Sequence, residues 1–167
     1  GTGYAADDFD WPRQQGFRVV QAEECWHKSL TPLMEEVRKQ MGSGPVYLSF
    51  DIDSLDPAFA PGTGTPEIGG LTTVQALEII RGCWGLNLVG CNLVEVSPPY
   101  DPSGKTAQTA ANLLFERLCV LPGVPQAPRC IPDGYRSSRR SRWRLPRPRS
   151  RWRVRTAAVT GSARHWR

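Results

Sequence analysis

Short apolar segments alternate along this chain with segments whose apolar residues recur at helical spacing, and this alternation limits the possible folds more than any other feature. Three expected strands take turns with three expected helices: strands at 16–21, 45–50 and 88–96, and helices at 31–41, 72–85 and 105–121. Such an order predicts a parallel sheet with helices packed against its faces. The mostly apolar segment 88–96 is typical of a strand that is covered on both sides. The sequence therefore predicts a three-layer α/β/α fold.

Two of the expected helices carry recognisable start signals. Thr31 is placed to act as an N-cap, with Pro32 at the first helical position. Thr72 and Gln75 have the spacing of a capping box, in which the two residues bond each other's backbone N–H groups. Gly42 is expected to end the first of these helices.

Charge divides the chain into two unlike parts. Residues 1–124 hold 8 of the 21 Lys and Arg residues and 15 of the 16 acidic residues, whereas residues 125–167 hold 13 Arg and a single acid, Asp133. We therefore expect one domain at 1–124 and an Arg-rich, disordered extension at 125–167. Two interpretations of the extension stay open. It is either a basic arm for nucleic acid or acidic lipid, or the product of GC-rich codons read in an unintended frame.

Other compositional features exclude several classes of protein. The five cysteines form no Cys-x-x-Cys pair and are odd in number, which favours free thiols in a reducing compartment over a disulfide framework. No run of 18 apolar residues occurs, so no transmembrane helix is expected and a membrane is not an expected partner. The chain starts at Gly1 without Met, and we interpret it as a fragment that begins inside a domain.

Two carboxylates follow the expected strand 45–50. Asp51 and Asp53 would point to the same side if the pleat of the strand continued through them. Two unpaired acids on one face repel each other, and their burial is costly without a compensating cation. Carboxylate oxygens suit hard divalent metals such as Mn²⁺, Mg²⁺ or Ca²⁺. The pair therefore predicts a metal site at the end of this strand.

A longer pattern surrounds the two acids and extends from Ser49 to Gly70, and a second follows at Leu93–Asp101. Together they resemble the ureohydrolase family, which contains arginases and agmatinases, and within it the animal agmatinases most of all. The resemblance covers residues 1–121. The first pattern is matched by Asp51, Asp53, Pro57, Pro61, Gly62 and Gly70.

The resemblance implies an arginase-like fold, incomplete on its N-terminal side, from the C-terminal part of a hydrolase. The implied reaction cleaves a guanidinium C–N bond and converts agmatine to putrescine and urea, a step of polyamine synthesis. The implied cofactor is a pair of Mn²⁺ ions about 3.5–4 Å apart, which lowers the pKa of a bridging water toward 7. By the same resemblance Asp51 and Asp53 bind metal, Glu95 holds the planar guanidinium, and the Thr65 hydroxyl contacts the substrate.

The chain also departs from the family pattern. The Gly-Gly-Asp-His and Asp-x-His-x-Asp motifs, which supply the other metal ligands, are absent, and His27 and His165 lie in neither. We therefore assign no catalytic residue and expect the chain alone to be inactive. Asp56 is expected to cap the turn beside Pro57 rather than to bind metal. The missing strands are expected to leave an open apolar sheet edge.

The family also implies a homo-oligomeric, mitochondrial enzyme, although no targeting segment is visible in this sequence. Two other interpretations stay open. One is a non-catalytic isoform whose basic arm binds acidic partners, or whose sheet edge docks on full-length subunits. The other is a Ca²⁺- or Mg²⁺-binding module of different function. A nucleic-acid partner is expected only through the basic extension.

Overall fold

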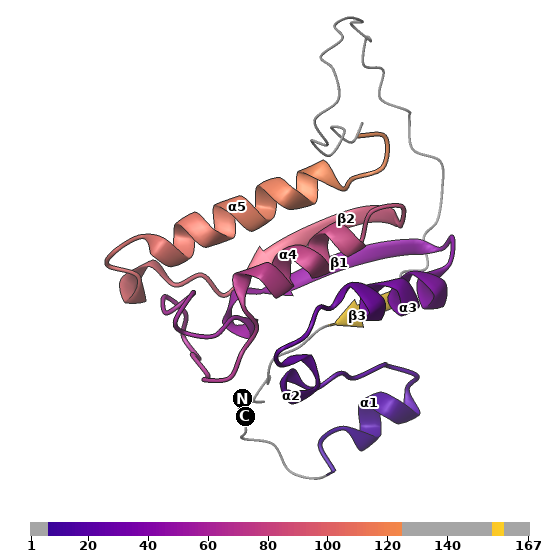
Figure 1. The fold of residues 1–167 in the computed structure, drawn as a ribbon, viewed down its shortest axis with the longest axis horizontal. Helices are drawn as coiled ribbons and strands as arrows, with labels where there is room; N and C mark the ends of the chain where they lie inside the picture. Colours follow the sequence, from indigo (N-terminus) through magenta and orange to yellow (C-terminus); the bar gives the residue numbers. More distant parts are fainter. Residues whose placement is uncertain (1–6, 125–154, 159–167) are drawn as a thin grey trace, which may run out of the picture.

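The computed structural model describes residues 7–124 and 155–158, which form a parallel sheet packed against helices (Figure 1). Three of its helices are longer than two turns, and two 3₁₀ turns follow the ends of the first two strands. In chain order the elements are α1 Asp10–Gln14, α2 Ala22–Cys25, α3 Thr31–Met41, β1 Pro45–Asp51, η1 Ile52–Ser54, α4 Thr73–Gly82, β2 Asn87–Val94, η2 Pro98–Tyr100, α5 Lys105–Cys119 and β3 Arg155–Ala158.

The sheet has the strand order β2-β1-β3, and both outer strands run parallel to β1. Helix α4 connects β1 to β2, which makes this part a β-α-β unit. The β1–β2 pairing shifts by one residue between Val46 and Tyr47 and then runs without interruption to the pair Asp51–Val94. The carboxyl ends of the two strands therefore lie side by side.

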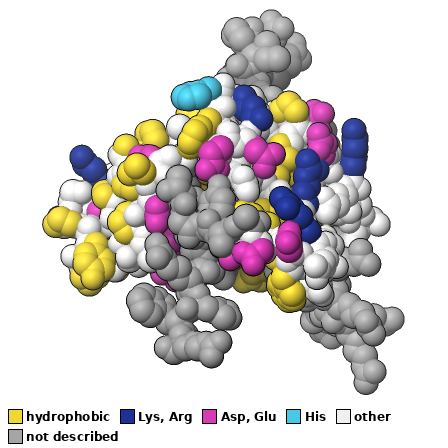
Figure 2. All heavy atoms as spheres, turned by 90° about the horizontal axis from the view of Figure 1, so that it is seen from below, with side chains coloured by type: hydrophobic (Ala, Val, Ile, Leu, Met, Phe, Trp, Pro, Cys, Tyr) yellow, Lys and Arg dark blue, Asp and Glu magenta, His cyan; other side chains and the backbone are white. Residues whose placement is uncertain are grey.

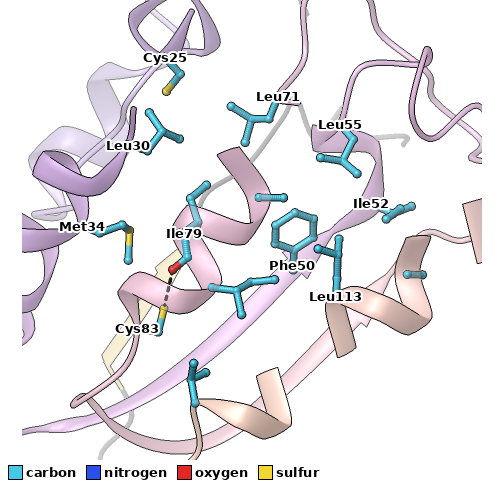
Figure 3. Close-up of a cluster of buried hydrophobic side chains, with 14 of the residues drawn as sticks. Cys25, Leu30, Met34, Phe50, Ile52, Leu55, Leu71, Ile79, Cys83 and Leu113 are labelled. Atoms are coloured by element: carbon cyan, nitrogen blue, oxygen red, sulfur yellow. Dashed lines mark hydrogen bonds between the residues drawn. The ribbon is translucent and has the colours of Figure 1, made fainter. Parts of the chain in front are cut away.

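The hydrophobic core lies between the sheet and the three long helices. Helix α4 packs against α3 on one side and α5 on the other, so the three form one layer (Figure 1). Phe50 of β1 meets Ile79 of α4 and Leu113 of α5 in the middle of this core (Figure 3). The α3–α4 contact is close, because a Cβ atom on Gly82 would lie 2.6 Å from Cβ of Met34.

The predicted helices are confirmed, with one change in how a helix begins. The capping box is present: Thr72 Oγ1 accepts the Gln75 N–H at 3.2 Å, and Gln75 Oε1 accepts the Thr72 N–H at 2.9 Å. Thr31 is the first residue of α3 rather than its N-cap, which is Leu30. The Leu30 N–H donates to Glu78 of α4 at 2.6 Å and the Thr31 N–H donates to Ser29 Oγ at 3.2 Å, so a tertiary and a local contact together satisfy free N–H groups at the start of α3.

Residues 16–21 are not a strand, contrary to the sequence prediction. They run irregularly between α1 and α2, and Val20 packs partly against the core. A strand needs a hydrogen-bonded neighbour. Both edges of β1 are already occupied, by β2 and β3, so this segment finds no place beside the central strand.

Strand β2 ends at Val94, two residues earlier than predicted. The reason lies in the next residue, because Glu95 has a left-handed backbone with φ 67°. This conformation breaks the extended geometry that a strand requires.

The Arg-rich extension expected at 125–167 stays a prediction, and Arg155–Ala158 are the residues of it that the structure describes. These residues form β3 and pair with Val46–Ser49 of β1, on the edge that was expected to stay open. Paired backbone groups no longer offer a template for another chain. The remainder of the predicted extension lies outside the described residues.

The surface and the cysteines of the described part agree with the composition. Acidic side chains gather around the middle of the face shown in Figure 2. Cys25, Cys83, Cys91 and Cys119 are free thiols, while Cys130 falls outside the described residues. In residues 7–124 and 155–158, none of the helices is both long and apolar enough to cross a membrane.

Candidate metal and guanidinium site

The candidate site lies where β1 and β2 end. Asp51 is the last residue of β1, and its partner across the sheet is Val94, the last residue of β2. Glu95 is the next residue, so its backbone lies one position beyond the partner of Asp51. Ligands of open α/β sheets bind at this edge, outside the carboxyl ends of the strands.

Asp51 and Asp53 are brought together by a tight turn and not by the pleat of a strand. The chain leaves the sheet after Asp51, and Ile52–Ser54 form the 3₁₀ turn η1. Asp51 caps this turn, since its Oδ1 accepts the backbone N–H of Asp53 at 3.2 Å. The fully buried Ile52 side chain anchors the turn in the core. The expected convergence of the two acids is present, but its cause is different from the one predicted.

The electrostatics of the pair point to a missing positive charge. Burial is the main cause that raises the pKa of the Asp51 carboxyl from 3.8 to about 7, followed by side-chain hydrogen bonding to Asp53. The negative charges of Asp53 and Glu95 raise this pKa further, while the Asp53 N–H opposes them. Without a cation, the folded chain therefore favours a proton on Asp51 up to near-neutral pH.

Asp53 provides the sharper indication. Its Oδ2 accepts the Thr65 hydroxyl at 2.5 Å, whereas its Oδ1 is buried and receives no hydrogen bond from the described residues when Asp51 is ionised. A buried carboxylate oxygen without a partner is costly, and a hard cation would satisfy it. In residues 7–124 and 155–158, however, no three His, Cys, Asp or Glu residues form a group that could hold a metal. The two carboxylates fit one part of a metal site and do not complete it.

Glu95 has a strained backbone and an exposed side chain. A left-handed conformation costs a non-glycine residue about 1–2 kcal/mol. Here it turns the chain out of β2 at the point where the side chain leaves the sheet edge. Glu95 is therefore not a buried acid at the end of the strand.

The loop 56–70 folds back on itself and carries Thr65 to Asp53. Asp56 closes the loop: its Oδ1 accepts the Ala58 N–H and its Oδ2 accepts the Gly69 N–H, both at 2.9 Å. Gly70 fits only because it lacks a side chain, since a Cβ atom there would lie 2.6 Å from the Asp56 nitrogen. The prediction that Asp56 caps a turn is confirmed.

One residue that shapes the site was missed by the sequence analysis. Asp101 is buried, its Oδ2 accepts the Ala107 N–H at 2.9 Å, and its side chain fills the space beside Gly62. Thr106 Oγ1 accepts the Gly62 N–H at 2.8 Å, and Gly62 O accepts the Ser97 N–H at 2.9 Å. These contacts fasten the loop 56–70 to the segment after β2. The sequence signal was an acid four residues ahead of a helix.

His27, the one histidine in the described part of the chain, belongs to another surface. It is exposed and lines a groove of about 690 Å³ together with Trp26 and Lys28. The residues that line this groove do not include Asp51, Asp53 or Glu95. This position agrees with the absence of His27 from the family motifs that supply metal ligands.

Comparison with known proteins gives this geometry a context. The profile of the Arginase family matches residues 2–119. Three curated relatives are a guanidinobutyrase of Pseudomonas aeruginosa, a mitochondrial agmatinase of Gallus gallus and a mitochondrial guanidino acid hydrolase of Homo sapiens, with 76%, 73% and 70% identity over 122, 124 and 124 residues. The matches cover 73–74% of this chain but only 35–38% of the relatives. The chain thus spans less than two-fifths of their length.

Solved structures agree with the sequence relatives. A hypothetical agmatinase from Burkholderia thailandensis is 44% identical, with a TM-score of 0.63 over 70% of this chain and 36% of that protein. A proclavaminate amidino hydrolase from Streptomyces clavuligerus is 42% identical, with a TM-score of 0.65 over 71% of this chain and 39% of that protein. The predicted arginase-like α/β fold, in incomplete form, is thereby confirmed.

Proposed function

This chain belongs to the arginase family, and on that premise we propose that it carries one part of the site of a metal-dependent hydrolase that cleaves guanidinium C–N bonds. The observation that carries the proposal is the partnerless, buried Oδ1 of Asp53 beside Asp51, at the sheet edge shared with Glu95. In the reaction, water adds to the guanidinium carbon, the C–N bond to the alkyl chain breaks, and urea and a protonated amine leave.

Asp51 and Asp53 are the residues that would hold manganese. Both offer carboxylate oxygens, the ligand type that Mn²⁺ shares with Mg²⁺ and Ca²⁺. When bound, a manganese pair would supply a water whose pKa is lowered toward neutrality. Thr65 keeps Asp53 in one orientation through its short hydrogen bond, and this leaves Oδ1 facing away from the hydroxyl.

Glu95 would hold the substrate. A carboxylate accepts two parallel N–H bonds from a planar guanidinium, which fixes both the position and the plane of the reacting carbon. The exposed carboxylate at the end of β2 supports this role. The Thr65 hydroxyl donates its hydrogen bond to Asp53, and its oxygen can still accept one N–H from the substrate guanidinium.

We infer that the substrate is a linear guanidino compound. Agmatine was expected from the sequence, and one relative bears the name agmatinase. Others are named for guanidinobutyrate or guanidino acids, which makes a carboxylate-bearing substrate an equal candidate. Glu95 would contact only the guanidinium end that these compounds share. Mitochondrial location and homo-oligomeric assembly stay predictions, the former supported by the names of the chicken and human relatives.

The first test is direct binding of Mn²⁺, measured on the purified chain by electron paramagnetic resonance of the free ion. We expect Asp51→Asn and Asp53→Asn each to weaken binding about tenfold or more, because each removes a charged ligand. Asp10→Asn, at an exposed acid in α1, is the matched control and should bind as the parent does. Equal binding by all four chains would refute the metal assignment.

The second test is release of urea from agmatine and from 4-guanidinobutyrate in the presence of Mn²⁺. We expect no turnover by this chain alone, because two carboxylates cannot fix a pair of metals. Sustained urea release that disappears with Asp53→Asn would overturn this expectation while supporting the assigned reaction. Saturation-transfer NMR then decides the role of Glu95, since Glu95→Gln should lose contact with the guanidinium of both compounds.

A further inference from the structure

We propose that Arg117 is a positioning residue for the candidate site, which holds the ends of β1 and β2 in the register that brings Asp51 and Glu95 together. Arg117 lies on α5 and is 1% exposed, the largest fully buried side chain of the described residues. The proposal rests on the proposed function only for the roles given to the two acids.

The guanidinium of Arg117 contacts both strands just before they end. Its Nη1 donates a hydrogen bond to the backbone oxygen of Asn92 in β2. Its Cζ lies 5.3 Å from the centre of the Phe50 ring in β1, in the geometry of a cation–π contact. Phe50 directly precedes Asp51, and Asn92 lies three residues before Glu95. One rigid, planar group thus contacts the last residues of β1 and β2, the two strands whose ends carry Asp51 and Glu95.

The contribution of Arg117 to fold stability does not by itself explain a buried arginine at this position. Nε and Nη2 have no hydrogen-bond partner in the part of the chain that the structure describes. Burial lowers the pKa of Arg117, although the nearby Cys91 and Cys83 and side-chain hydrogen bonding to Cys91 oppose this shift. Apolar residues that replace buried charges in other proteins are often neutral or stabilising. An unbranched apolar side chain such as Met would fill the same space without this penalty.

A Met side chain cannot form the directional contacts that Arg117 makes with the Asn92 carbonyl and the Phe50 ring. The guanidinium has its Cζ over the Phe50 ring and donates from Nη1 to the Asn92 carbonyl, so the same rigid group contacts both strands and fixes them relative to each other. A residue whose burial does not favour the stability of the fold is expected mainly at or near a functional site. The compensating gain here would be the fixed distance between Asp51, the last residue of β1, and Glu95, the residue that follows β2.

The test compares amide hydrogen exchange at the two ends of the β1–β2 ladder. The variants are Arg117→Met, Arg117→Lys and Phe50→Leu, with Arg81→Met as the matched control. Arg81 of α4 pairs with Glu116 of α5 at an exposed position. Replacing Arg81 therefore removes an arginine that contacts neither strand. Global stability is measured by urea unfolding, and Mn²⁺ affinity with the metal alone.

In Arg117→Met we expect unfolding to need at least as much urea as in the parent chain. At the same time, the amides around Asp51 and Val94 should exchange about tenfold faster, while those around Val46 and Leu88 keep their protection. Mn²⁺ affinity should fall about tenfold. Arg117→Lys should restore part of the protection, because an ammonium can donate to the Asn92 carbonyl but cannot stack as a plane. Arg81→Met should change neither end selectively.

The proposal is overturned if Arg117→Met speeds exchange equally along both strands together with a loss of global stability, since this is the signature of a merely structural residue. It is also overturned if exchange at the site end does not change. If Arg117→Met does not fold, Phe50→Leu decides, because it removes the ring and keeps the charge; unchanged exchange at Asp51 then refutes the role. A parent chain that binds no Mn²⁺ would defeat the metal assignment, whereas the exchange comparison would still judge Arg117.

Discussion

Replacing Asp51 by asparagine should stabilise the metal-free chain at neutral pH, although it removes a proposed metal ligand. In the unfolded chain this carboxyl ionises near its ordinary value of 3.8, but in the folded chain the pKa is raised to about 7, mainly by burial and by Asp53. A raised folded pKa means that the contribution to stability is complete below pH 3.8 and is lost as the pH rises through 7. Asparagine resembles the protonated form at every pH and avoids this loss.

The size of the effect follows from the same values. The interval from 3.8 to about 7 corresponds to roughly 4 kcal/mol at ~1.4 kcal/mol per pH unit, if nothing screens the charge. Asp51 is only partly buried, so solvent screens it, and we expect about 1–2 kcal/mol at pH 8. At pH 4 the difference should vanish, because the parent carboxyl is then protonated when folded.

The assay is urea unfolding in metal-free buffer at several pH values between 4 and 8, with Asp10→Asn as the control at an exposed acid. The difference between Asp51→Asn and the parent should grow with pH and level off above 7. Added Mn²⁺ should then raise the stability of the parent only, because a ligand stabilises the state that binds it. A difference that is independent of pH, or an Asp51→Asn chain less stable than the parent at pH 8, would refute this reasoning.

Two further outcomes separate support of the loop from binding. Asp56→Ala removes the acceptor of the Ala58 and Gly69 N–H groups and should lower the free energy of unfolding by about 1–3 kcal/mol. The amount of Mn²⁺ bound per folded molecule should stay the same. A loss of Mn²⁺ by the folded variant would make Asp56 a ligand. Glu95→Gly relieves the left-handed backbone at φ 67° and should raise the free energy of unfolding by about 1 kcal/mol, while guanidinium binding in NMR is lost; a destabilised variant would mean that the Glu95 side chain supports the fold.

The long helices and the two main strands could be predicted because their signals are local. The capping box of Thr72 and Gln75 and the apolar spacing of α3, α4 and α5 depend on residues within a few positions of each other. The strand predicted at 16–21 is absent because a strand forms only when it pairs with another strand. The residues of 16–21 do not indicate which segment could pair with them. The same reason explains why β3 was missed in a segment rich in arginine.

The position of the candidate residues at one sheet edge could be predicted from the sequence, whereas their geometry could not, and their roles stay predictions. Asp51, Asp53, Thr65 and Glu95 meet at one sheet edge, as the family pattern implied. The pleat argument for the two aspartates was wrong, since a 3₁₀ turn joins them. Arg117 lies in no motif, and Asp101, although it ends the second family pattern, was assigned no role. Their importance depends on burial and on contacts with residues that are distant in sequence.

The sequence by itself determined which residues are the candidates for the chemistry, because carboxylates after an apolar strand and the surrounding proline and glycine pattern occupy neighbouring positions. It also determined the helices, whose hydrogen bonds close within one turn. Only the tertiary structure decided how β1 and β2 align, which strand covers the far edge of β1, and which oxygen of Asp53 is left without a partner. These features depend on burial and on hydrogen bonds between distant segments, and such contacts come into being only when the whole chain packs.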